Sequence, residues 1–86
     1  MEGLTEGRIV HFVMPSGEHR PAIVVRVWNI DHCEGYSNLC VFVDGLNDVK
    51  RSESDSSKDI PMTLWETSIC YSENKEIGTW HWIEKA

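Results

Sequence analysis

The chain has 86 residues, a formal net charge of −6 and a hydrophobic fraction of 41%. This length fits one domain, near the lower limit for a core that needs neither a metal ion nor a disulfide. Because proteins that bind polymeric nucleic acid normally carry a basic stripe, the acidic balance argues against DNA or RNA as a partner. Small phosphorylated ligands stay possible, since two or three arginines suffice to hold them.

The first two predicted strands are joined by a tight turn. Residues 7–13 (GRIVHFV) have the pattern of a short strand. The run Pro15, Ser16 and Gly17 then combines residues that favour the corners of a turn. The second strand is predicted to begin at Pro21, which can open a strand but cannot donate a hydrogen bond within a central ladder.

Two of the predicted strands are apolar on both faces. The runs at residues 21–28 (PAIVVRVW) and 38–44 (NLCVFVD) lack the alternation expected where one face of a sheet meets water. The sequence contains no stretch with the periodicity of a helix that could cover the second face. We therefore expect another copy of the chain, a ligand, or both to cover it, and we predict a homo-oligomer.

A long polar loop is predicted between the third and fourth strands. Residues 46–63 include the Ser-rich, charged run RSESDSSKD and lack apolar anchors at its centre. The fourth strand is predicted over residues 65–71. Alternation places four residues on one face: Trp65, Thr67, Ile69 and Tyr71.

A fifth strand over residues 78–83 (GTWHWI) completes the predicted set. Five short strands with tight turns and one long loop favour a barrel, because closure removes exposed strand edges. We predict that residues 1–86 form a single all-β domain, a small five-stranded antiparallel barrel of the SH3-like kind with one long Ser-rich loop.

Cysteine and histidine show no spacing typical of a metal site. Structural zinc ligands usually come in close pairs, and here only His32 and Cys33 are adjacent. We therefore predict neither a metal site nor a cofactor. The three cysteines are odd in number and widely spaced, so we expect free thiols in a reducing compartment.

Motifs of known enzymes are also missing from the sequence, which contains no nucleophile elbow and no glycine-rich phosphate loop. Cys70 and His81 would be neighbours if their strands pair, giving a nominal thiol and base. Packing and hydrogen bonding account for both residues more simply. We predict that the chain is not an enzyme.

Aromatic and basic side chains are the candidates for ligand binding. Trp80 and Trp82 share a face of the fifth strand, where each can either fill the core or stack on a ligand ring. Arg26 interrupts an apolar strand and must reach water, a carboxylate such as that of Glu66, or an anionic ligand. The predicted ligand-binding residues are His19, Arg20 and Arg26 for phosphates, Trp28, Trp65 and Trp80 for stacking, and Thr67 and His81 for hydrogen bonds.

Four motifs run through most of the chain: GRIVHFV at residues 7–13, GEHRPAIVVRVW at 17–28, NL, VF, DG and ND between 38 and 48, and GTWHW at 78–82. Together they resemble a family of small uncharacterised proteins encoded by tailed phages and prophages. Members often have Arg at the position of Glu66. The resemblance implies a protein that acts in the cytoplasm of an infected bacterium.

Other small phage proteins sequester nucleotide signals made by bacterial immune systems. By analogy with them, we predict a non-enzymatic anti-defence protein that binds a cyclic nucleotide or an ADP-ribose derivative. A structural or interaction protein is the alternative, either a virion accessory or an inhibitor that docks on a host protein through its acidic surface. A hydrolase of the same nucleotides is a third class. The sequence has no apolar run of membrane-spanning length and no signal-peptide start, so we expect no membrane partner and no secretion.

Overall fold

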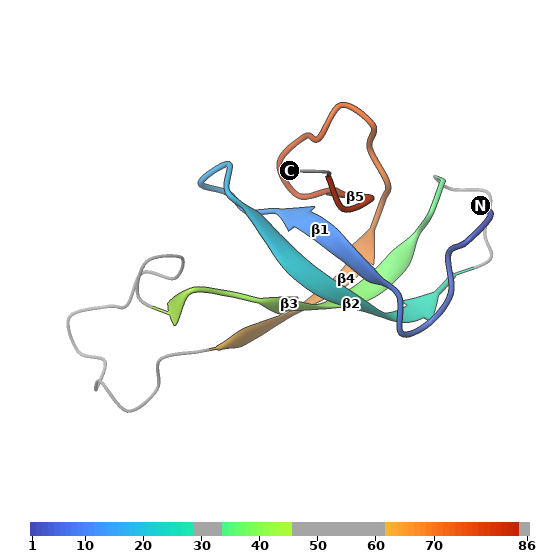
Figure 1. Cartoon of the computed structure of the whole chain (residues 1–86), viewed down its shortest axis with the longest axis horizontal. Coiled ribbons are helices and arrows are strands. Elements are labelled where there is room, and N and C mark those ends of the chain that lie inside the picture. The colour runs from blue at the N-terminus through green and yellow to red at the C-terminus, as the bar shows by residue number, and fades with distance from the viewer. Residues whose placement is uncertain (29–33, 46–61, 85–86) are drawn as a thin grey trace.

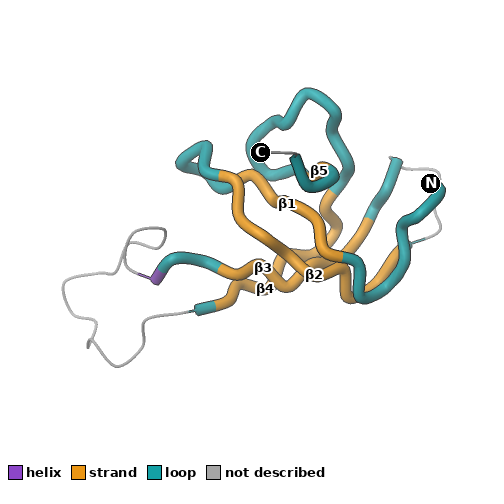
Figure 2. The backbone as a smooth tube through the Cα atoms, in the orientation of Figure 1, coloured by secondary structure: helices purple, strands orange, loops and turns teal. Residues whose placement is uncertain are grey.

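The computed structural model describes residues 1–28, 34–45 and 62–84 (Figure 1). Five β-strands form one antiparallel sheet with the order β4-β3-β2-β1-β5 (Figure 2). The strands are β1 (Ile9–Val13), β2 (His19–Val27), β3 (Ser37–Phe42), β4 (Thr63–Ile69) and β5 (Trp80–His81). The prediction of an all-β chain with five antiparallel strands is confirmed. Most of the predicted Ser-rich loop, residues 46–61, lies outside the described residues, and β4 includes its last position.

The inner face of the sheet carries the core. Val10, Ala22 and Val41 are paired in register across β1, β2 and β3, and none of them exposes any surface. Trp80 is also fully buried and is paired with Phe12 across β5 and β1. This row of small and branched side chains leaves room for the large indole, so the core is built around Trp80.

The outer face of the same strands is apolar and half-exposed. The residues next in sequence to Val10, Ala22 and Val41 point to this outer face and are also paired in register across the strands. We call them, together with their partner on β4, the outer row: Ile9, Ile23, Cys40 and Trp65. Ile9 is 50% exposed and Trp65 is 57% exposed, while Phe42 beside them on β3 is 41% exposed. The prediction that β2 and β3 are apolar on both faces is therefore confirmed.

Bulges in β2 and β4 lie on either side of Asn38. The β2–β3 register shifts between Val24 and Arg26, and the β3–β4 register shifts between Ser37 and Leu39. The extra residue in β4 places Ser68 at a positive φ of 59°. A bulge of this kind interrupts the alternation of a strand.

The bulge makes one sequence prediction wrong. We predicted Trp65, Ile69 and Tyr71 on one face of the fourth strand. In the structure Trp65 belongs to the outer row, whereas Ile69 and Tyr71 pack against the core. Because a strand has a period of two residues, one inserted residue moves every later side chain to the other face.

Backbone hydrogen bonds connect the segment that follows β4 to β5. The Trp80 N–H donates to the Cys70 carbonyl, and the Ser72 N–H donates to the Trp80 carbonyl. The Trp80 indole Nε1 also donates to the Gly35 carbonyl over 2.7 Å. These bonds anchor the two-residue strand β5, while barrel closure and the SH3-like arrangement stay predictions.

The expectation of three free thiols is wrong for Cys70. Cys70 is disulfide-bonded, whereas Cys40 is a free thiol. Cys33 lies outside the described residues. A reducing compartment therefore no longer follows from the cysteines. Across the described ranges, no helix has both the length and the apolar character needed to cross a bilayer.

Candidate functional site

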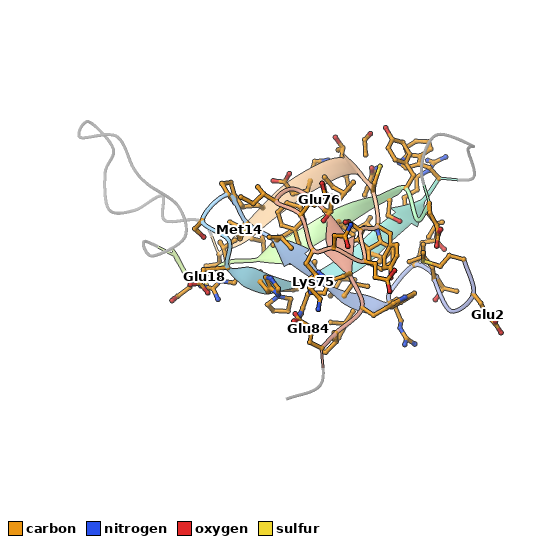
Figure 3. The ribbon with its side chains drawn as sticks, turned by 90° about the horizontal axis from the view of Figure 1, so that it is seen from above. Glu2, Met14, Glu18, Lys75, Glu76 and Glu84 are labelled. Carbon is orange, nitrogen blue, oxygen red and sulfur yellow. The ribbon has the colours of Figure 1, made fainter. Side chains whose placement is uncertain are left out.

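Three histidines and one glutamate meet at the β5 side of the outer face. His11 lies on β1 and is paired with His81 on the neighbouring strand β5. His19 begins β2, opposite Val13 of β1. Glu84 follows β5, beside Lys75 (Figure 3). We call these four side chains the histidine–glutamate cluster: His11, His19, His81 and Glu84.

One oxygen of Glu84 lies at the centre of the histidine–glutamate cluster. Its Oε1 atom is 2.6 Å from Nδ1 of His19, 2.7 Å from Nε2 of His81 and 3.4 Å from Nδ1 of His11. The other oxygen, Oε2, lies 3.6 Å from the Lys75 ammonium. The three imidazoles therefore direct one nitrogen each toward a common point.

Exposure differs across the histidine–glutamate cluster. The side chain of His81 is only 3% exposed, whereas those of His19 and Glu84 are 30% and 38% exposed. His81 thus forms the buried floor of the cluster. The partly exposed side chains of His19 and Glu84 leave the histidine–glutamate cluster open to solvent on the opposite side.

Hydrogen bonds from His19 and then His81 lower the pKa of Glu84 from its usual 4.5 to about 2. Burial lowers the pKa of His81, and this effect exceeds the opposing one of its hydrogen bond with Glu84. At neutral pH, Glu84 is consequently ionised and His81 is neutral. The imidazole nitrogens of His19 and His81 that face Oε1 therefore donate hydrogen bonds to an ionised carboxylate.

A separate cavity opens beside the start of β1. Its volume is about 410 Å³, and it is lined by Gly7, Arg8, Ile9, Trp82 and Ile83. The guanidinium carbon of Arg8 lies 5.4 Å from the centre of the Trp82 ring. This volume is within the range of about 300–1,000 Å³ seen for small-ligand pockets. The cavity combines a cation with an aromatic ring.

The predicted ligand-binding residues do not share one pocket. His19 and Arg20 begin β2, whereas Arg26 lies about 20 Å further along the same strand at about 3.3 Å per residue. His19 and His81 are brought together in the histidine–glutamate cluster. Arg20 is 3.8 Å from a carboxylate oxygen of Glu18.

The tryptophans and Thr67 are distributed over different surfaces. Trp80 lies in the core, so its predicted role in stacking on a ligand is replaced by a packing role. Trp28 is covered by the Arg26 guanidinium at 4.1 Å, and its Nε1 donates to Asn38. Trp65 is part of the outer row, and Thr67 is exposed on β4.

Sequence reasoning missed His11 and Glu84 as members of a site. Both strands that hold His11 and His81 were predicted, but the register that pairs the two residues was not. The only signal in the sequence is that alternation in the first predicted strand places His11 on one face with Ile9 and Val13. Glu84 lies beyond the last predicted strand, where no periodicity assigns a direction to its side chain.

Comparisons with protein-family models, curated proteins and solved structures find no match for this chain. The resemblance to tailed-phage proteins therefore stays a prediction.

Proposed function

We propose that this chain is a non-enzymatic binding module that takes a nucleotide-type ligand in the cavity between Arg8 and Trp82. The observation that carries the proposal is the pairing of these two side chains at 5.4 Å on the wall of a cavity of about 410 Å³. Nucleotides present the two complementary groups, a planar base and an anionic phosphate.

The chemistry of the cavity supports this ligand class. A guanidinium binds phosphate oxygens through paired hydrogen bonds, and both the guanidinium and the indole stack on aromatic rings. Trp80 packs against the indole of Trp82. The two ring centres are 5.0 Å apart, and the ring planes are nearly perpendicular. A base would stack on the Trp82 ring in place of the Arg8 guanidinium, which would turn toward the phosphate.

The resemblance to phage proteins suggests what such binding would accomplish. In the cytoplasm of an infected bacterium, a phage protein that binds a cyclic nucleotide or an ADP-ribose derivative without turning it over would sequester an immune signal. We propose this anti-defence role as the concrete version of the function.

We expect one member of a panel of cyclic nucleotides and ADP-ribose derivatives to raise the melting temperature of the pure protein. At a ligand concentration of one hundred times Kd, stabilisation is about 2.7 kcal/mol, or roughly 10 °C or more for a domain of this size. The substitution Arg8→Met should remove most of the shift, because it removes the cation and keeps the length of the side chain.

Arg26→Met is the matched control for this experiment. Arg26 also lies over a tryptophan ring, but outside the cavity. The ligand should still stabilise this variant. A panel in which no compound shifts the melting temperature would contradict the proposal, and so would a shift that Arg26→Met removes and Arg8→Met retains.

We also propose that a second copy of the chain covers the outer row. None of the four residues in the row is charged, although the chain has a net charge of −6. Two copies can therefore meet at this face without bringing like charges into direct contact. Burying half-exposed side chains such as Ile9 and Trp65 would contribute favourable free energy in proportion to the apolar area covered.

A further inference from the structure

We propose that the histidine–glutamate cluster binds one zinc ion. The cluster is separate from the cavity between Arg8 and Trp82, because none of its four residues lines that cavity. The inference therefore goes beyond the proposed nucleotide binding and does not depend on it.

The donor atoms of the histidine–glutamate cluster already surround a common point. One nitrogen from each histidine and one oxygen of Glu84 all lie within 4.8 Å of one another. Zinc bonds to nitrogen and oxygen are about 2.0–2.2 Å long, so tetrahedral ligands lie about 3.4 Å apart. Side-chain movements on the order of 1 Å would bring the four atoms to this spacing, with Oε1 of Glu84 moving outward from the centre.

The sheet holds the histidines in place. They come from the adjacent strands β2, β1 and β5, and the backbone pairing of His11 with His81 fixes the separation of these two residues. The ring centres of His19 and His81 are 4.7 Å apart. Ligands on neighbouring strands lose less conformational freedom on binding an ion than histidines on a flexible loop.

The buried histidine directs one nitrogen at the centre of the histidine–glutamate cluster. The side chain of His81 is 3% exposed, and its Nε2 atom lies 2.7 Å from Oε1 of Glu84. A bond from Nε2 to a metal ion would help to offset the cost of burying this imidazole.

Metal binding at the histidine–glutamate cluster competes with protons. Zinc needs neutral imidazoles and an ionised carboxylate, since a proton on the donor atom competes with the metal. Three neutral imidazoles and one carboxylate carry a charge of −1, which would partly neutralise a divalent cation.

The donor types favour zinc over magnesium and calcium. Magnesium and calcium prefer shells made of oxygen atoms, whereas imidazole nitrogen suits zinc, copper and nickel. Four protein ligands at tetrahedral spacing form a closed site of the structural kind. The four residues come from separate strands and the segment after β5, whereas sequence spacing reveals ligands only when they share one tight turn.

A zinc ion at this position would link the segment after β5 to the sheet. The strand β5 has only two residues, and Glu84 lies three residues beyond His81. Small domains often rely on a metal ion to hold elements that a limited core cannot. We infer that the ion fixes β5 and the following residues against β1 and β2.

The test is a cobalt titration of the full chain after treatment with a chelator. Cobalt(II) replaces zinc in tetrahedral sites and gives intense visible absorption bands there. We expect saturation at one ion per chain and loss of the bands on addition of equimolar zinc. The substitutions His19→Ala and Glu84→Gln should each weaken cobalt binding by about 100-fold or more.

Lys75→Met is the matched control, because its ammonium contacts Oε2 of Glu84 but is not a donor to the ion. This variant should bind cobalt within a few-fold of the unmodified chain. His19 and Glu84 are partly exposed, so their variants should fold, and circular dichroism would verify that they do. Absence of tetrahedral cobalt bands in the unmodified chain would overturn the proposal, as would equal cobalt affinity in the folded His19→Ala and Glu84→Gln variants.

Discussion

Replacing Gly35 by Ala is expected to remove most of the stability of the fold. Gly35 has a φ of +66°, and a Cβ atom there would lie 2.6 Å from Cζ2 of Trp80 and 2.9 Å from Cβ of Tyr71. The Gly35 carbonyl also accepts the hydrogen bond from the Trp80 indole. Displacement of the indole would disturb the centre of the core. We expect a loss of about 3–5 kcal/mol in the free energy of unfolding, measured by urea denaturation.

Gly17→Ala separates the effect of the backbone from that of the collision. Gly17 has a φ of +91°, but no atom of the described residues lies within 4 Å of the position of its Cβ. Its substitution should cost only the strain of the left-handed backbone, about 1–2 kcal/mol. If both variants lose the same free energy of unfolding, the collision of the added Cβ with Trp80 does not contribute to the destabilisation in Gly35→Ala.

The substitution Asn38→Leu is expected to have the second largest effect on stability. Oδ1 of Asn38 accepts hydrogen bonds from the Ser68 backbone over 3.0 Å and from the Trp28 indole over 2.9 Å. A leucine would leave both donors without this acceptor and release the bulge in β4. We expect a loss of about 2–3 kcal/mol in the free energy of unfolding, measured by the same denaturation.

Asn38→Asp is the matched variant, because it keeps an acceptor oxygen at the same distance along the side chain. The loss in its free energy of unfolding should be less than half of the loss for Asn38→Leu. If the aspartate and leucine variants unfold at the same urea concentration, the two hydrogen bonds do not stabilise the bulge.

The strands could be predicted because their signals are local. Gly17 lies in a turn that separates two β-rich runs, and the continuous apolar character of residues 21–28 requires a strand that is covered on both faces. Both features are visible within a few residues. The structure confirms the strand in each case and shows the second face half-exposed.

The direction of the side chains in β4 could not be predicted for a physical reason. Ser68 adopts a positive φ at the bulge, a conformation that serine rarely takes, and Asn38 from another strand stabilises it. Nothing near Ser68 in the sequence indicates this contact. The face assigned to Ile69 and Tyr71 was therefore wrong.

The histidine–glutamate cluster shows the same limit for a site. His11 and His81 are seventy positions apart in the sequence, and they become neighbours only through the pairing of β1 with β5. Periodicity placed each residue on a face but carried no information about which strands pair. Trp82 was considered as a residue that could stack on a ligand, yet the cavity that unites it with Arg8 depends on the same pairing.

The two proposed sites share one segment of the chain. Trp82 and Ile83 line the cavity and lie between His81 and Glu84 of the histidine–glutamate cluster. An ion bound to the cluster would therefore hold one wall of the cavity. The proposals remain separable, because cobalt titration reports on the cluster in the absence of any nucleotide.

Analytical ultracentrifugation is the most direct test of the claim that a second copy of the chain covers the outer row. At micromolar concentration the unmodified chain should sediment as an oligomer. Trp65→Lys should sediment as a folded monomer, because it replaces the largest apolar side chain of the outer row with a charge. Ile77→Lys is the matched control, since Ile77 is 62% exposed and lies outside the five strands. A folded monomer for the unmodified chain at these concentrations would contradict the claim.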